Sequence, residues 1–150
     1  MHVATQFSIF MVNKPGVLAQ ILGEFARAKI NIVAMTMMDT VEHGVMRVVF
    51  ASSEKAAQVL TKINMPFNET EVICVNLANK SGALLDVVEK LAKNHINISY
   101  AYCTAGAKGG RTTGILKVTD VVKAMKILGK NAASTKKSQV VLRRAKATRK

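Results

Sequence analysis

Asn13-Lys14-Pro15-Gly16 recurs 66 residues later in the chain as Asn79-Lys80-Ser81-Gly82. At the same offset, without a gap, Ile30-Asn31-Ile32 matches Ile96-Asn97-Ile98. Nine of the 32 positions aligned from residue 13 are identical, and most of them fall in these two motifs. Chance does not produce such clustering. The 150-residue chain therefore contains two copies of one structural unit.

The hydropathy pattern gives each copy the same order of elements. Residues 5–12 alternate and then become apolar, which predicts a strand. The motif at 13–16 ends this strand, and we expect Asn13 to cap a helix whose first turn contains Pro15. The apolar residues that follow are spaced as one helical stripe in both copies: Val17, Leu18, Ile21, Leu22 and Phe25, then Ala83, Leu84, Val87, Val88 and Leu91.

The rest of each copy predicts a hairpin, a helix and a final strand. Strands should run from Ile-Asn-Ile to about Met38 and Cys103, with hairpins closed by Gly44 and Gly110. Ser53-Glu54 and Thr119-Asp120 should cap helices over 54–63 and 120–129. Residues 67–78 are long enough to finish the first unit and begin the second. For the second unit, 139–142 is the candidate last strand.

Each unit thus has the order β-α-β-β-α-β, the split βαβ arrangement. The predicted fold is α+β, with two ferredoxin-like units in tandem and helices on one face of antiparallel sheets. We expect one unit over 1–70, another over 71–143 and a mobile basic tail over 144–150. The units should form a pseudo-dimer joined through the edges of their second strands, and the chain should further form a homodimer.

Composition restricts the class of protein. Apolar residues make up 49%, enough for a core, and no run approaches the roughly 20 residues that span a bilayer. No signal peptide is visible, and Cys74 and Cys103 are expected to be buried free thiols, so we expect a cytoplasmic protein. The net charge of +13 is concentrated at the end, because residues 130–150 carry eight Lys or Arg and no acid.

Val12-Asn13-Lys14-Pro15-Gly16-Val17-Leu18, followed by a helix and Ile30-Asn31-Ile32, resembles the signature of the ACT domain, a regulatory module that binds amino acids. Over residues 5–130 the chain resembles free-standing proteins made of two ACT domains. In that family the ligand lies where the strand-to-helix loop of one unit meets the second strand of its neighbour. The resemblance therefore implies ligand contacts from Asn13, Lys14, Pro15, Gly16, Val17, Leu18, Asn31 and Ile32, and from Asn79, Gly82, Ala83, Leu84, Asn97 and Ile98.

The chain departs from the family pattern at a few of these positions. Ser81 replaces the usual proline and Ala83 the usual valine of the second loop. A histidine that some members carry two positions before the loop asparagine is Met11 here, and Leu77 in the second copy.

Physical chemistry allows two interpretations of these residues. The amino end of a helix offers free N–H groups and partial positive charge to a carboxylate, and Gly16 allows close approach. Asn13 and Asn31 each offer a donor and an acceptor to an amino acid. The same residues also suit a cap, a turn and a strand start, and their repetition does not discriminate between the interpretations.

Other chemistry has little support in the sequence. The histidines and cysteines lack ligand spacing, and no nucleophile motif or carboxylate pair appears, so we expect no metal, cofactor or catalysis. The glycine-rich residues 105–112 precede a strand and predict a hairpin rather than a phosphate loop. Met35, Met37, Met38 and Met46 are expected to fill the core.

The leading hypothesis is a regulatory protein that binds a small amino acid and modulates a partner enzyme or a transcriptional process. The alternative is a nucleic-acid-associated or scaffolding protein that acts through its basic carboxyl-terminal tail. RNA binding on the sheet is disfavoured, because Phe50 is the only aromatic residue that the two central strands supply.

Overall fold

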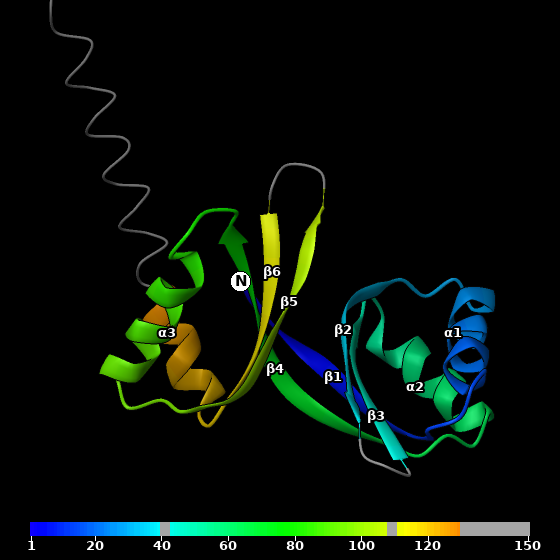
Figure 1. The fold of residues 1–150 in the computed structure, drawn as a ribbon. Coiled ribbons are helices and arrows are strands. Elements are labelled where there is room, and N and C mark those ends of the chain that lie inside the picture. The colour runs from blue at the N-terminus through cyan, green and yellow to red at the C-terminus, as the bar shows by residue number, and fades with distance from the viewer. Residues whose placement is uncertain (40–42, 108–110, 130–150) are drawn as a thin grey trace, which may run out of the picture.

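The computed structural model describes residues 1–39, 43–107 and 111–129. Its elements follow the predicted order (Figure 1). They are β1 (His2–Val12), α1 (Val17–Arg27), β2 (Ile32–Asp39), β3 (His43–Phe50), α2 (Ser53–Lys62), β4 (Phe67–Ala78), α3 (Ala83–Lys93), β5 (Ile98–Ala107) and β6 (Arg111–Val118), followed by a helix over 121–129. The α+β class and the two ferredoxin-like units are confirmed. The expected strand over 139–142 and the basic tail lie outside the described residues.

All six strands form one antiparallel sheet in the order β2-β3-β1-β4-β6-β5. The two units are joined by β1 and β4, which pair from His2–Cys74 to Ile9–Phe67. The prediction that second-strand edges join the units is therefore wrong. The second strands β2 and β5 lie at the two ends of the sheet, which curls so that they contact each other without a hydrogen-bonded ladder.

Strand β4 belongs to both units, as its length predicted. Its first part, Phe67–Cys74, pairs with β1, and its last part, Ile73–Ala78, pairs with β6. A division of the chain between residues 70 and 71 thus falls inside one strand.

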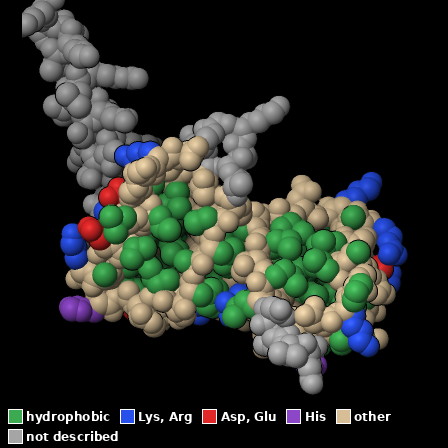
Figure 2. Space-filling model, viewed as in Figure 1, with side chains coloured by type: hydrophobic (Ala, Val, Ile, Leu, Met, Phe, Trp, Pro, Cys, Tyr) green, Lys and Arg blue, Asp and Glu red, His purple; other side chains and the backbone are tan. Residues whose placement is uncertain are grey.

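The helices cover one face of this sheet, at its two ends (Figure 1). Alternate residues of β1, beginning with Phe7, pack with Ile21 and Phe25 of α1 and Leu60 of α2. In the second unit, Ile73 and its alternate neighbours on β4 pack with Leu91 of α3. The predicted stripe of α1 faces the first core through Val17, Leu18, Ile21 and Phe25. In α3, Ala83, Val87 and Leu91 face the second core, but Leu84, which the stripe also included, is 39% exposed. Figure 2 shows hydrophobic side chains in two separate groups on the viewed face.

A smaller cluster lies on the opposite, helix-free face. It joins Ala34 and Val49 of the first unit to Cys74 and Ile115 of the second, with Tyr102 packed against them. Because it contains residues of both units, this cluster packs the two units against each other.

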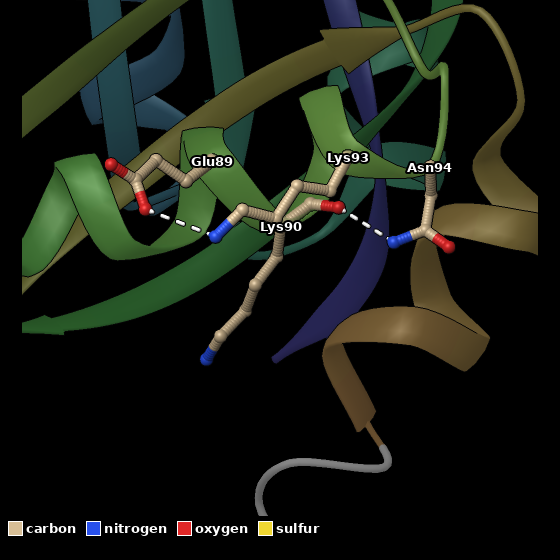
Figure 3. Close-up of polar contacts among 4 residues, drawn as sticks. All are labelled: Glu89, Lys90, Lys93 and Asn94. Carbon is tan, nitrogen blue, oxygen red and sulfur yellow. Dashed lines mark hydrogen bonds and ion pairs between the residues drawn. The ribbon is translucent and has the colours of Figure 1, made fainter.

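The end of α3 is closed by a non-glycine residue in the left-handed conformation, His95, with φ 56°. The N–H of His95 donates to the carbonyl of Ala92 and that of Ile96 to the carbonyl of Leu91, both at 3.0 Å, and side chains add to these bonds. The Asn94 amide donates to the carbonyl of Lys90 at 2.8 Å, and Lys93 pairs with Glu89 at 3.5 Å (Figure 3). Lys123, in the following helix, donates to the carbonyl of Asn94 at 2.8 Å. The expected cap of that helix is confirmed, because Asp120 accepts from the N–H of Lys123 at 2.8 Å.

Two expectations about burial are wrong. Met46 is buried, but the three methionines of β2 are not: the exposed fractions of Met35, Met37 and Met38 are 37%, 44% and 45%. They lie on an edge strand, where a single neighbouring strand leaves side chains uncovered. Cys103, on the opposite edge strand, is also exposed, whereas Cys74 is buried as expected. Phe50 lies in the first core and offers no surface for stacking a base.

Candidate ligand-binding site

The two strand-to-helix loops have nearly the same backbone geometry. Gly16 has φ 89° and ψ −20°, and Gly82 has φ 86° and ψ −11°. The N–H of Val17 donates to the carbonyl of Lys14 at 3.4 Å, and the N–H of Ala83 to that of Lys80 at 3.3 Å. These are type II turns, in which the third residue requires positive φ and is therefore glycine. Apart from the glycine itself and its two chain neighbours, no residue has an atom within 4 Å of the position where a Cβ would stand on either glycine.

Each glycine, and not the preceding asparagine, is the cap residue of its helix. α1 begins at Val17 and α3 at Ala83, and neither has a side-chain cap. The expectations that Asn13 caps α1 and that Pro15 lies in its first turn are wrong, because Pro15 is the second residue of the turn. At α2 the cap residue is Ser52, one residue before the expected Ser53. The first turns of α1 and α3 therefore present backbone N–H groups beside an open space.

The residues at the start of the second strands, β2 and β5, lie far from these loops. Along the strand direction they are level with the middle of the β1–β4 ladder. Ile32 pairs with Phe50, one step beyond the Gln6–Val49 pair. Ile98 pairs with Val118, two steps beyond the Leu116–Ile73 pair. Asn31 and Asn97 each precede these strands, and their carbonyls accept from Ala51 at 2.9 Å and from Thr119 at 3.1 Å.

One chain does not bring the two halves of the expected site together. The first loop follows Val12, which pairs with His43, whereas Ile32 pairs with Phe50 at the other end of β3. Six or seven residues of strand, roughly 20 Å, separate the loop from Asn31. The second unit has the same arrangement. Since β1 and β4 are antiparallel, the two loops also lie at opposite ends of the sheet, away from the other unit's second strand.

A cavity of about 370 Å³ lies beside the first loop, which contributes Val17 to its wall. The other lining residues are mostly apolar: Phe10, Met11, Val12, His43, Met65 and Pro66. Sequence reasoning missed this cavity. Its signal was the pair Phe10 and Val12, apolar residues on the helix-free side of β1, whose side chains are 39% and 47% exposed.

The family model for the ACT domain pair matches residues 1–141. The chain belongs to this family. The chain is similar to the crystal structure of protein BT0572 from Bacteroides thetaiotaomicron, with 26% sequence identity and a TM-score of 0.80, covering 87% of this chain and 89% of that one. The regulatory subunit of aspartate kinase from Thermus thermophilus has the same fold, with 11% identity, a TM-score of 0.60 and coverage of 87% and 97%. No curated protein matches the chain.

Within residues 1–39, 43–107 and 111–129, no group of three or more His, Cys, Asp or Glu side chains is placed to hold a metal ion. None of the helices in that part of the chain is long and apolar enough to cross a membrane.

Proposed function

We propose that this ACT pair is a regulatory protein that binds a small amino acid and modulates a partner enzyme or a transcriptional process. The observation that carries the proposal is the open turn at Gly16. There, the cap residue of α1 has no side chain to bond the first N–H groups of the helix, and beyond its chain neighbours nothing lies within 4 Å of where a Gly16 Cβ would stand. An α-carboxylate suits this end of a helix. The family assignment supports the proposal, as does the fold shared with a regulatory subunit of aspartate kinase.

The first loop is the better site of the two. The first turn of α1 contains no acidic residue, whereas that of α3 contains Asp86. A carboxylate side chain at the amino end of α3 occupies the favourable potential and repels an anionic ligand group. The apolar cavity beside Val17 could take the side chain of an aliphatic amino acid.

A complete site needs a second copy of the chain. Asn31 and Ile32 lie roughly 20 Å from the loop of their own unit, so the second strand that meets the loop must come from a partner. Strand β2 has a surface for such contact, because Met35 and Met37, which pair with Val48 and Met46, lie on one side of it and are 37% and 44% exposed. The expected homodimer and the ligand site are thus one proposal.

A thermal-shift screen against the twenty amino acids tests the ligand, since a ligand that binds only the native state raises Tm. Light scattering tests the assembly: we expect twice the chain mass of 16.2 kDa, and a monomer for Met37→Glu. Leu85→Glu, on α3 where the side chain is 57% exposed, is the control and should remain dimeric. If a monomeric Met37→Glu variant binds the amino acid with unchanged affinity, the shared site is wrong.

A further inference from the structure

A second cavity, of about 380 Å³, lies on the helix-free face between the two units. Both units contribute to it, the first through β1, β2, β3 and the first part of β4, and the second through β5 and β6. Its lining residues are Ser8, Phe10, Met38, Val45, Arg47, Asn68, Thr70, Ser99, Tyr100 and Lys117. It has the volume of a small-molecule site.

The charge of this cavity has one sign. Arg47 and Lys117 are cationic, and none of the ten lining residues is acidic. The Arg47 guanidinium lies over the ring of Tyr100, with 3.8 Å from its central carbon to the ring centroid. Its Nε is buried and has no hydrogen-bond partner among the described residues. A buried donor without a partner is costly, so Arg47 lacks an acceptor that a bound anion could supply.

A buried network holds the aromatic wall of the cavity in place. Gln6 is fully buried; its amide nitrogen donates to the Tyr100 hydroxyl at 2.7 Å, and its oxygen accepts from the Tyr102 hydroxyl at 3.0 Å. Because the Tyr100 oxygen accepts from Gln6, its own proton can be donated elsewhere. Burial raises the pKa of Tyr102, which keeps this phenol a neutral donor to Gln6.

The repeat itself does not require these residues. Four of them have small or apolar, uncharged counterparts at the 66-residue offset: Gln6, Arg47, Tyr100 and Lys117 correspond to Val72, Thr113, Ala34 and Ala51. The same fold thus forms at the related place without the network and without these two cations. A polar network that the fold does not need is a mark of a functional site.

We propose that this cavity binds a small organic anion, a carboxylate or phosphate ester with an apolar body. The acid group lies between Arg47 and Lys117, and the apolar body lies on Phe10, Met38 and Val45. Because the walls come from both units, a bound anion fixes their relative position. Phe10 lines both this cavity and the one beside the Gly16 loop, but the other nine lining residues do not, and this proposal does not depend on the amino-acid site.

Tyrosine fluorescence reads this cavity directly. The chain has no Trp and two Tyr, residues 100 and 102, and both belong to the network. The probes are cyclohexanecarboxylate, cyclohexyl phosphate and cyclohexylmethylammonium, which share an apolar body and differ in charge and acid group. We expect saturable changes with at least one of the two anions and no change with the cation. Binding of one or both anions identifies the acid group that the cavity accepts.

Three variants assign the binding to the cavity. Lys117→Met should weaken the anion roughly tenfold, the loss expected for one charge-assisted hydrogen bond. Arg47→Thr, which introduces the residue of the related position, should weaken it as much, and circular dichroism reports whether it folds. Lys55→Met removes the same charge from α2 and should leave the affinity unchanged.

Equal titrations with the cation, or equal affinities in Lys117→Met and Lys55→Met, would overturn the proposal. Failure of both anions to bind at millimolar concentration would do the same. Tm alone does not report where an amino acid binds, so a shift found in the screen is assigned to the Gly16 loop only where Lys117→Met keeps it and Gly16→Asp abolishes it.

Discussion

Thr5 pairs with Glu71, the residue that follows it by 66 positions. Because 66 is also the repeat offset, this pair lies on the approximate two-fold axis that relates the two ACT units. The other pairs of β1 and β4 obey the same symmetry: His2–Cys74 corresponds to Ser8–Asn68. The two units are therefore fused about one axis in the middle of the sheet, and neither has a complete sheet without the other.

This fusion predicts one cooperative unfolding transition. Leu60 and Leu91 are both fully buried, one in each core. Either one replaced by Ala should lower the free energy of unfolding by about 2–5 kcal/mol. Leu60→Ala should shift the urea midpoint of tyrosine fluorescence, although both tyrosines lie in the second unit, together with that of circular dichroism.

The matched control is Leu85→Ala on α3, where the side chain is 57% exposed and the expected loss is below about 0.5 kcal/mol. Separate midpoints for the two signals in Leu60→Ala would show that the units unfold independently.

The repeat and its periodicity were enough to predict the elements, the buried stripe of α1 and the fold of each unit. They were not enough to predict how the units join. An alternating pattern such as that of β1 specifies which face of a strand is buried, but not which backbone edge pairs with which neighbour. The same limit explains Met35 and Met37, which have the pattern of core residues and become exposed because β2 is an edge strand.

The candidate site could be predicted only in part, because local sequence predicts turns but does not predict which distant residues meet. The open glycine turns follow from the local sequence, because a type II turn needs positive φ at Gly16 and Gly82. The cavity between the units does not follow from the local sequence, because Gln6, Arg47 and Tyr100 are far apart in the chain and none of them belongs to a motif. Gln6, a polar residue at an inward position of a strand, was the available signal.

Tyr102→Phe should destabilise the protein through the partner that it leaves behind. The Gln6 oxygen accepts from the Tyr102 hydroxyl at 3.0 Å, and Gln6 is fully buried. Loss of this donor should lower the free energy of unfolding by about 1–3 kcal/mol, measured by urea denaturation. Combining it with Gln6→Leu should cost less than the sum of the two single changes, because the second change removes the unsatisfied group. Additive losses would contradict the network.

The same hydroxyl predicts a fall in stability at alkaline pH. Burial, followed by the effect of Tyr100, raises the pKa of Tyr102 above its ordinary value of 10.0. Above pH 10.0 the Tyr102 hydroxyl loses its proton in the unfolded chain but keeps it in the folded chain. The contribution of this group to stability is therefore complete below its ordinary pKa and is lost as the pH rises toward its pKa in the folded protein. Urea midpoints measured between about pH 8 and pH 11 should fall less steeply in Tyr102→Phe.

Burial also raises the pKa of the Cys74 thiol above its ordinary value of 9.0. Ionisation of the Cys74 thiol therefore also lowers the stability as the pH rises. Tyr102→Phe keeps this contribution, and Cys74→Ala should remove it. Identical slopes in the wild type and in Tyr102→Phe would show that this phenol ionises equally in both states.

Charge at Gly16 should decide whether the first loop binds the amino acid. An aspartate there would face the ligand carboxylate, since nothing lies within 4 Å of its Cβ. Positive φ at Gly16 strains any side chain, so the matched variant is Gly16→Asn, which has nearly the same shape, tolerates this conformation and carries no charge. Calorimetry with the amino acid found in the screen should show binding abolished in Gly16→Asp and largely kept in Gly16→Asn.

Gly82→Asp should matter less, because Asp86 already lies in the first turn of α3. Asn31→Ala should weaken binding by about 1–2 kcal/mol, the cost of an unpaired polar group of the ligand. Unchanged affinity in Gly16→Asp, with native circular dichroism, would mean that the loop is only a turn and that the amino acid binds elsewhere.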